Sequence, residues 1–137
     1  MTKAWSCWLL GIAACAVFAS AQPVSPSTDG ALLPRDSVEA AEFRGSVVFG
    51  QYCVTCHGIN ADGKGRAARL YNPRPANLRL SDKNDEYIGL IVRIGGAAMA
   101  RSEFMPPWSA ELTEEQMRDV VVYVRSINVS NTSENNR

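Results

Sequence analysis

Two cysteines and the only histidine of this chain of 137 residues lie together in the stretch CVTCH, Cys53 to His57. Two thiols and one imidazole at this spacing can hold a metal ion, form a redox-active disulfide or attach a haem covalently. Zinc needs four protein ligands in a structural site and three in a catalytic site. The other two cysteines, Cys7 and Cys15, lie in an apolar N-terminal segment, so the number of available ligands disfavours zinc.

A redox dithiol of the thioredoxin type also uses the spacing C-x-x-C, but there the motif follows a strand in a βαβ unit. No alternation of apolar and polar residues persists over six residues of this chain, so no strand is predicted before CVTCH. Haem attachment fits each residue of the stretch. The two thiols can form thioether bonds to the haem vinyl groups, and the adjacent histidine can bind the iron.

A haem iron bound by one histidine takes a second axial ligand or leaves that position open. Because the chain has no second histidine, ligation by two of its own histidines is excluded. Four methionines remain, of which Met1 starts the N-terminal segment and Met117 falls on an apolar helical stripe. Met105 is followed by two prolines, which fix φ and stiffen the loop that holds the thioether. We therefore predict Met105 as the second ligand, with Met99 as the alternative.

Three helices must position these residues. The first is predicted over residues 38–52 with Ser37 as its N-cap, so that it ends just before the first cysteine of CVTCH. The second is predicted over 83–94, before Gly95-Gly96, and the third starts at Thr113, where T-E-E-Q is a capping-box pattern. The fold class is therefore all-α, with long loops. The apolar residues expected to pack inward are Val38, Ala41, Gly45, Val48, Phe49 and Tyr52, then Tyr87, Leu90, Ile91 and Ile94, and last Met117, Val120, Val121, Val124 and Ile127.

Residues 1–21 have the pattern of a secretory signal peptide, with Lys3, an apolar stretch and a cleavage site after Ala21. The stretch is shorter than the roughly 20 residues that span a bilayer, which favours export over a permanent anchor. Lipoprotein processing at Cys15 is the alternative, because the residues before it resemble that signal. The predicted location is periplasmic or otherwise exported. A membrane location follows only if the signal stays uncleaved or Cys15 is lipidated.

After the signal, the chain divides into a Pro-rich tether over 22–37, a domain over 38–127 and a disordered tail over 128–137. A folded part of about 90 residues has a marginal core by itself, and a large buried cofactor would help to explain how it folds. The 14 basic and 14 acidic residues balance. A nucleic-acid partner is therefore not expected, since such proteins carry a basic bias.

The order of these motifs resembles the class I c-type cytochromes of the small, exported, monohaem kind. The resemblance covers residues 42–127 and rests on Gly45 and Phe49 followed by CVTCHG, GINADGKG, PRPANL, DEYIGLIVRIGG, EFMPPW and LTEEQMRDVVVYVRSI. It implies a cytochrome c-like fold in which three main helices and long loops wrap around one haem c. It also implies thioether bonds at Cys53 and Cys56, with His57 as proximal ligand and Met105 as distal ligand.

The same resemblance implies roles for residues around the haem. In the family, a proline carbonyl after C-x-x-C-H accepts a hydrogen bond from the proximal histidine, which fixes the orientation of its ring. Pro75 is the residue we predict for this role, with Pro73 as the alternative. Trp108 would flank the haem edge. Gly45 would let the first helix approach the last one closely, and Phe49 and Tyr123 would pack across that crossing.

The function that the resemblance implies is electron transfer by a carrier that is not itself an enzyme. Its partners would be redox proteins, and the sequence identifies neither donor nor acceptor. Ligation by histidine and methionine raises the reduction potential of the iron. Two alternatives stay open at this point. One is a haem-based ligand sensor or catalyst with a displaceable sixth ligand, and the other is a cytochrome subunit of a dehydrogenase or oxidase complex.

Overall fold

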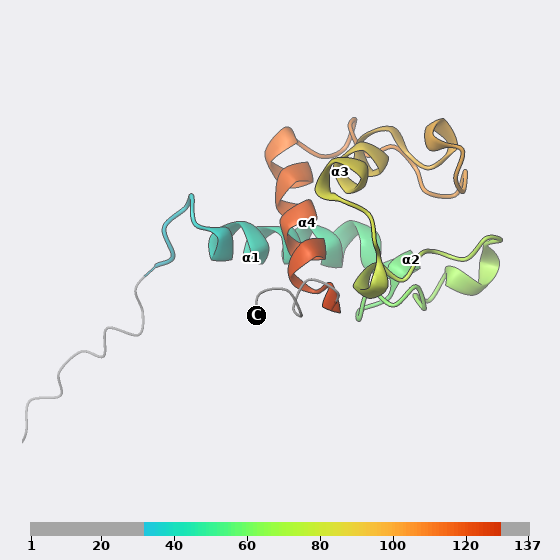
Figure 1. Ribbon diagram of the computed structural model, residues 1–137, viewed down its shortest axis with the longest axis horizontal. Helices are drawn as coiled ribbons and strands as arrows, with labels where there is room; N and C mark the ends of the chain where they lie inside the picture. Colours follow the sequence, from blue (N-terminus) through green and yellow to red (C-terminus); the bar gives the residue numbers. More distant parts are fainter. Residues whose placement is uncertain (1–31, 130–137) are drawn as a thin grey trace, which may run out of the picture. The chain divides into compact units, whose positions relative to one another are not determined.

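Helices supply the regular structure of residues 32–129, the part of the chain that the structure, a computed structural model, describes (Figure 1). No strand occurs in this part, and the prediction of an all-α fold is confirmed. The predicted signal peptide, residues 22–31 of the tether and residues 130–137 of the tail lie outside the described residues. The elements are α1 (Val38–Val48), the π-helical turn η2 (Phe49–Cys53), α2 (Val54–His57), the 3₁₀ turns η3 (Ala68–Leu70) and η4 (Leu78–Leu80), α3 (Asp85–Ile94), the 3₁₀ turn η5 (Ala97–Met99) and α4 (Glu114–Ser126).

The first helix starts where its cap predicts, and the helical run that it begins is longer than expected, although α1 itself ends at Val48. The Ser37 hydroxyl accepts a hydrogen bond from the backbone N–H of Ala40 at 3.1 Å. The predicted end at residue 52 is wrong, because the helical chain continues through η2 and α2 to His57. In η2 the N–H of Val54 reaches back five residues to the carbonyl of Phe49, the hydrogen bond of a π-helix. CVTCH is therefore held on helical backbone instead of in a loop.

The crossing of α1 and α4 depends on a glycine. A Cβ placed on Gly45 would lie 2.0 Å from the carbonyl oxygen of Asp119 and 2.9 Å from the Cβ of Tyr123. Only hydrogen fits between two backbones at this distance. Next to the crossing, the rings of Phe49 and Tyr123 pack with their centroids 5.3 Å apart and tilted by 54°. Both predictions for this crossing, the close approach and the aromatic pair, are confirmed.

The core lies between α4, the start of η2 and α3. The stripe predicted for α4 is confirmed, because four of its members are buried and Ile127 is packed against them. Thr113 also forms the predicted capping box with Gln116. The buried apolar residues of this core are Val48, Phe49, Ala61, Ile88, Val92, Leu112, Met117, Val120, Val121 and Val124.

The second helix differs from its prediction at its start and on its buried face. It begins at Asp85, after Asn84, whose side chain accepts a hydrogen bond from the N–H of Tyr87 at 2.9 Å. Its core residues are Ile88 and Val92, whereas the predicted Leu90 is 45% exposed. Apolar residues occur on more than one side of this helix, so its spacing alone does not identify the side that faces α4.

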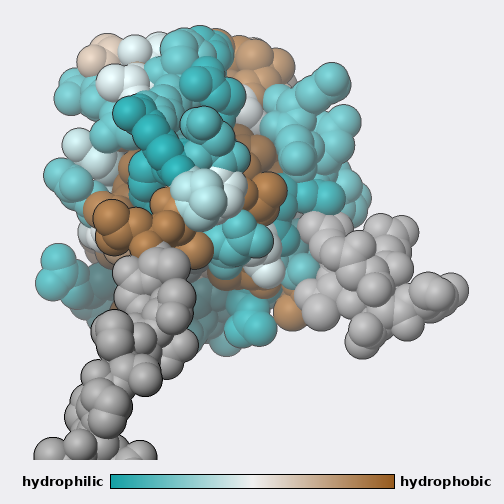
Figure 2. All heavy atoms as spheres, turned by 90° about the vertical axis from the view of Figure 1, so that its left-hand side faces the viewer, coloured by the Kyte–Doolittle hydropathy of each residue, from teal (hydrophilic) through white to brown (hydrophobic). Residues whose placement is uncertain are grey.

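The start of α1 also differs from its prediction, because Val38 was expected in the core. Val38 is 67% exposed, and the preceding apolar residues Leu32 and Leu33 are 95% and 55% exposed. Figure 2 shows hydrophobic residues close to the point at which the described chain begins, with hydrophilic residues around them. The helix turns its buried side toward α4 only from Ala40 onward.

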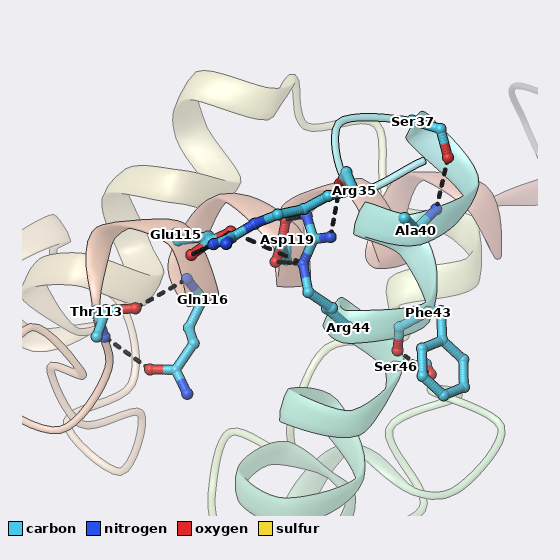
Figure 3. A network of polar contacts seen from close by, with 10 residues as sticks. All are labelled: Arg35, Ser37, Ala40, Phe43, Arg44, Ser46, Thr113, Glu115, Gln116 and Asp119. Atoms are coloured by element: carbon cyan, nitrogen blue, oxygen red, sulfur yellow. Dashed lines mark hydrogen bonds and ion pairs between the residues drawn. The ribbon is translucent and has the colours of Figure 1, made fainter. Parts of the chain in front are cut away.

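A buried carboxylate fastens α1 to α4 near the glycine crossing (Figure 3). Asp119 is 5% exposed, and its two oxygens accept hydrogen bonds from Nε and Nη2 of Arg44 at 2.7 and 3.1 Å. Arg44 also donates to the carbonyl of Arg35, whose own guanidinium pairs with Glu115 at 3.1 Å. The end of the tether is thus tied to both helices.

We expect Arg44→Ala to lower the midpoint of thermal unfolding much more than Arg35→Ala. The first change leaves the buried Asp119 carboxylate without its guanidinium partner, and an unpaired buried charge is strongly destabilising. The second change removes an exposed ion pair, which contributes little. Unfolding of both variants followed by circular dichroism measures the difference. Equal shifts would show that the Arg44 pair does not stabilise the helix crossing.

The folded part extends beyond its predicted limit of 127, at least to Asn128. Asn128 is 1% exposed, and its side-chain amide donates hydrogen bonds to the carbonyls of Leu78 and Ser81 at 3.2 and 2.7 Å. This residue was predicted to start the disordered tail, which is wrong because its amide is satisfied inside the domain. None of the helices within residues 32–129 has the length and apolar character needed to cross a bilayer.

Candidate functional site

A cavity of about 520 Å³ lies among η2, α2, α3, α4 and the segments before and after α3. Its volume falls within the roughly 300–1,000 Å³ of small-molecule and cofactor sites. Most of the residues around it are apolar. All six residues that the sequence analysis selected for the site line this one cavity: Cys53, Cys56, His57, Pro75, Met105 and Trp108.

The imidazole of His57 is oriented by a backbone carbonyl, although not by the predicted one. Its Nδ1 lies 3.1 Å from the carbonyl oxygen of Ala76. Pro75 lines the cavity, but its carbonyl oxygen faces Gly63, where a Cβ would lie only 2.4 Å from it. The prediction of Pro75 as acceptor, with Pro73 as the alternative, is therefore wrong by one residue. Consecutive carbonyls of this segment thus have different neighbours, Gly63 for Pro75 and the imidazole for Ala76.

This hydrogen bond fixes which nitrogen of His57 is free. A carbonyl oxygen can only accept, so Nδ1 carries the proton and Nε2 keeps its lone pair. Burial lowers the pKa of the imidazole, and the hydrogen bond to Ala76 opposes this shift only in part. The neutral ring is therefore favoured, with Nε2 available to bind a metal.

The thiols of Cys53 and Cys56 are free and are not joined in a disulfide. Burial raises the pKa of the Cys53 thiol to about 12, with a smaller contribution from the neighbouring Cys56. Reactive dithiols of redox enzymes have lowered pKa values, because the thiolate is their nucleophile. A redox-active dithiol is therefore a poor interpretation of this site.

The loop after α2 folds back onto the helical turn that carries the thiols. The N–H groups of Gly65 and Ala67 donate to the carbonyls of Cys56 and Thr55 at 3.1 and 2.9 Å. A Cβ on Gly65 would lie 2.4 Å from the Thr55 carbonyl oxygen, so only glycine permits this approach. The side chains of Val54 and Thr55 take no part in these bonds, so these two residues act as spacers between the two cysteines.

The thioether of Met105 lines the cavity together with His57, whereas Met99 does not line it. The carbonyl of Met105 accepts a hydrogen bond from the N–H of Gly96 at 2.8 Å. A Cβ on Gly95 would lie 2.7 Å from the nitrogen of Pro107, and one on Gly96 would lie 3.2 Å from the Cβ of Met105. The two glycines that end α3 therefore also form the surface on which the methionine segment rests.

Trp108 packs beside the cavity and is held by its backbone and its ring. Its N–H donates to the carbonyl of Val92 at 2.9 Å, and its ring meets the edge of Tyr52 with centroids 5.4 Å apart. The indole Nε1 is buried and has no hydrogen-bond partner among the described residues. The predicted position of Trp108 next to the site agrees with this packing.

Several residues around the cavity make contacts with one another that the sequence did not predict. Arg101 donates from Nε to the Tyr87 hydroxyl at 3.0 Å. The ammonium of Lys83 lies 5.8 Å from the centroid of the Tyr87 ring and pairs with Asp82 at 2.7 Å. These four residues make one part of the lining polar. Tyr71 and Phe104 also line the cavity, with stacked rings.

The donor set fits a covalently bound haem better than a metal ion held by the protein alone. An imidazole, a thioether and two free thiols share one mostly apolar cavity. In the described part of the chain, no three His, Cys, Asp or Glu side chains are close enough to share a metal ion. Cys53 and Cys56 would hold the haem, and the imidazole and thioether are the ligand pair of c-type cytochromes.

Comparisons with known proteins agree with this fit. The family model described as cytochrome C oxidase, cbb3-type, subunit III matches residues 40–124. Among solved structures, the chain is similar to one from the reducing HAO-like protein complex of Kuenenia stuttgartiensis, with a TM-score of 0.56 and 28% sequence identity. The similarity covers 74% of this chain and 47% of the other, so this chain spans about half the length of the solved chain. No curated protein matches it.

Proposed function

The chain belongs to the family of cytochrome C oxidase, cbb3-type, subunit III, and on this premise we propose that it carries electrons through a haem ligated by His57 and Met105. It is a small c-type cytochrome with covalently bound haem c. Haem-based electron transfer is the activity that its family and its solved neighbour support. The observation that carries the proposed ligation is the single cavity lined by His57, Met105, Cys53 and Cys56.

Two of these four side chains attach the haem, and the other two bind its iron. Cys53 and Cys56 hold the haem through two thioether bonds, which keeps it attached outside the cell. His57 binds the iron through Nε2 while Ala76 holds its other nitrogen. Met105 supplies the second ligand. When bound, the haem supplies a one-electron couple, whose potential is raised by histidine and methionine ligation.

The rest of the cavity lining keeps the site dry and rigid. The buried side chains of Ile88, Val92, Val120 and Val124 line it and exclude water from its inner wall. Backbone hydrogen bonds hold the segment that carries Met105 in place, one between Met105 and Gly96 and one between Trp108 and Val92. The geometry of a site held in this way changes little when its charge changes, which favours rapid electron exchange with a partner.

We also propose that the partners are redox proteins. The chain would work as a subunit of an oxidoreductase complex or donate electrons to such a complex. The matching family is described as an oxidase subunit, and the similar solved chain belongs to a protein complex. The proposed location is the periplasm or another exported compartment. The signal-peptide pattern of residues 1–21 supports it. Isolation of the protein from native membranes, with its partners retained, tests this assignment.

We expect Met105→Ala to abolish the methionine–iron charge-transfer band of the oxidised protein. The band requires a thioether on the iron, and Met105 is the methionine that lines the cavity with His57. Met99→Ala is the matched control and should leave the band unchanged, because Met99 lies outside the lining. Visible spectra of the purified, oxidised variants make the comparison.

Two other outcomes would redirect the proposal. Loss of the band in Met99→Ala, with its survival in Met105→Ala, would assign the ligand to Met99. Absence of the band from the wild type, together with rapid carbon monoxide binding by the reduced protein, would favour a ligand sensor with an open sixth position. Slow carbon monoxide binding with the band present supports the electron carrier.

A further inference from the structure

The segment that carries Met105 is attached to the rest of the domain on two sides, by different kinds of contact. On the side of α3, backbone hydrogen bonds join Met105 to Gly96 at 2.8 Å and Trp108 to Val92 at 2.9 Å. On the other side, the ring of Phe104 stacks on the ring of Tyr71, with centroids 4.8 Å apart and planes 29° apart. Phe104 directly precedes Met105, so the stack holds the backbone next to the residue that carries the thioether.

This stack connects two loop segments that share few other bonds. Tyr71 belongs to the segment over 58–80, which follows α2, and Phe104 to the segment over 97–112, which follows α3. The two lie at the same end of the domain, green to yellow below and orange above in Figure 1. No backbone hydrogen bond joins the described residues of these segments. The guanidinium of Arg101 turns to Tyr87 on α3 instead.

The two rings border both the cavity and solvent. Both line the cavity beside Met105, and Phe104 is 46% exposed to solvent. A half-exposed aromatic pair adds less to stability than a buried one, but it can close the space between two loops. Both rings therefore lie between the cavity and solvent, next to the segment that would have to move for an external ligand to replace Met105.

We propose that Tyr71 and Phe104 form a clasp that keeps the Met105 segment closed over the cavity and so limits the access of small external ligands. Both are positioning residues, because they act through the segment and not on the reacting atoms. The inference rests on the proposed function in one respect, namely that Met105 is the ligand that the clasp holds in place. It adds the reason for which the site would stay closed.

The test compares carbon monoxide binding to the reduced, haem-loaded full chain in wild type, Tyr71→Leu, Phe104→Leu and the double variant. Loss of the clasp should raise the observed binding rate about three- to tenfold, the change that corresponds to loss of an aromatic pair. The double variant should match either single variant, because all three lack the same contact. Tyr71→Phe keeps the ring and should keep the wild-type rate.

Leu70→Ala is the matched control. Leu70 precedes Tyr71 and is 72% exposed, but it does not line the cavity, so its loss should leave the rate unchanged. Unchanged rates in both leucine variants would overturn the clasp. So would single effects that multiply in the double variant, because the rings would then act independently.

Hydrogen exchange of the haem-loaded protein separates this inference from the proposed ligation. Amides of residues 97–105 and of Trp108 should exchange faster in Tyr71→Leu than in the wild type, with those of α4 unchanged. If the wild type lacks the methionine–iron band, the ligand assignment fails, and exchange still decides whether the rings hold the segment. Equal exchange in the wild type and Tyr71→Leu would overturn the clasp whichever ligand binds the iron.

Discussion

Replacement of both Cys53 and Cys56 by alanine should leave the exported protein with no haem that survives denaturation. The two thiols line the same cavity and are free, so they are available for the two thioether bonds. Without them, any haem in the cavity would be held by its iron ligands and by packing, and unfolding would release it. A pyridine haemochrome spectrum of the denatured, washed protein measures the haem that remains bound.

Val54→Ala and Thr55→Ala are the controls for this experiment, because they change the spacer residues and keep both thiols. Thr55 uses its backbone carbonyl, not its side chain, to accept the hydrogen bond from Ala67. Both controls should retain covalent haem at the wild-type level. Covalent haem in the double cysteine variant would show that the attachment site lies elsewhere, and its absence from the wild type would refute the haem site altogether.

Gly45→Ala should be among the most destabilising single substitutions in the domain. The added Cβ would lie 2.0 Å from the Asp119 carbonyl oxygen, so α1 and α4 would have to move apart. Overpacking that forces backbone shifts costs about 1–3 kcal/mol and occasionally more, and the closeness of this approach points to the upper end of that range. The displacement would also disturb the packing of Phe49 on Tyr123 and, with it, one wall of the cavity. Denaturant unfolding of the haem-loaded protein measures the loss.

The same helical run offers a control for this prediction. Gly50 is exposed, and a Cβ added there would meet no atom within 4 Å. Gly50→Ala should therefore be neutral or stabilise the protein by about 0.5–1 kcal/mol, the difference in helix propensity between the two residues. Similar free energies of unfolding for the two variants would show that the close crossing at Gly45 does not constrain the fold.

Features encoded by neighbouring residues could be predicted from the sequence. The caps at Ser37 and Thr113 and the end of α3 at Gly95 were predicted correctly, because each depends on hydrogen bonds or dihedral angles within a few residues. The attachment stretch CVTCH is equally local. Its residue types and spacing indicated the chemistry once the number of available ligands and the absence of predicted strands had disfavoured zinc and a redox dithiol, and the structure adds that a π-helical turn holds it on helical backbone.

Features that join distant segments could be predicted only in part. The resemblance to c-type cytochromes predicted that a carbonyl would orient His57, but the acceptor is Ala76 instead of Pro75, since the path of that loop decides which carbonyl faces the ring. The prediction of the buried side of α3 was wrong at Leu90. This helix carries apolar residues on more than one side, and only the position of α4 decides which side is buried.

The sequence by itself therefore determined the all-α class and the covalent chemistry of CVTCH, and it predicted Met105 in place of Met99 as the methionine of the site, because two prolines follow Met105. These depend on residue type and short-range geometry. Only the tertiary structure decided which residues gather around the cavity. The stack of Tyr71 on Phe104 and the bond from Arg101 to Tyr87 join residues far apart in the chain, and no local pattern marks them. Such contacts follow from how whole segments pack, which the spacing of residues does not specify.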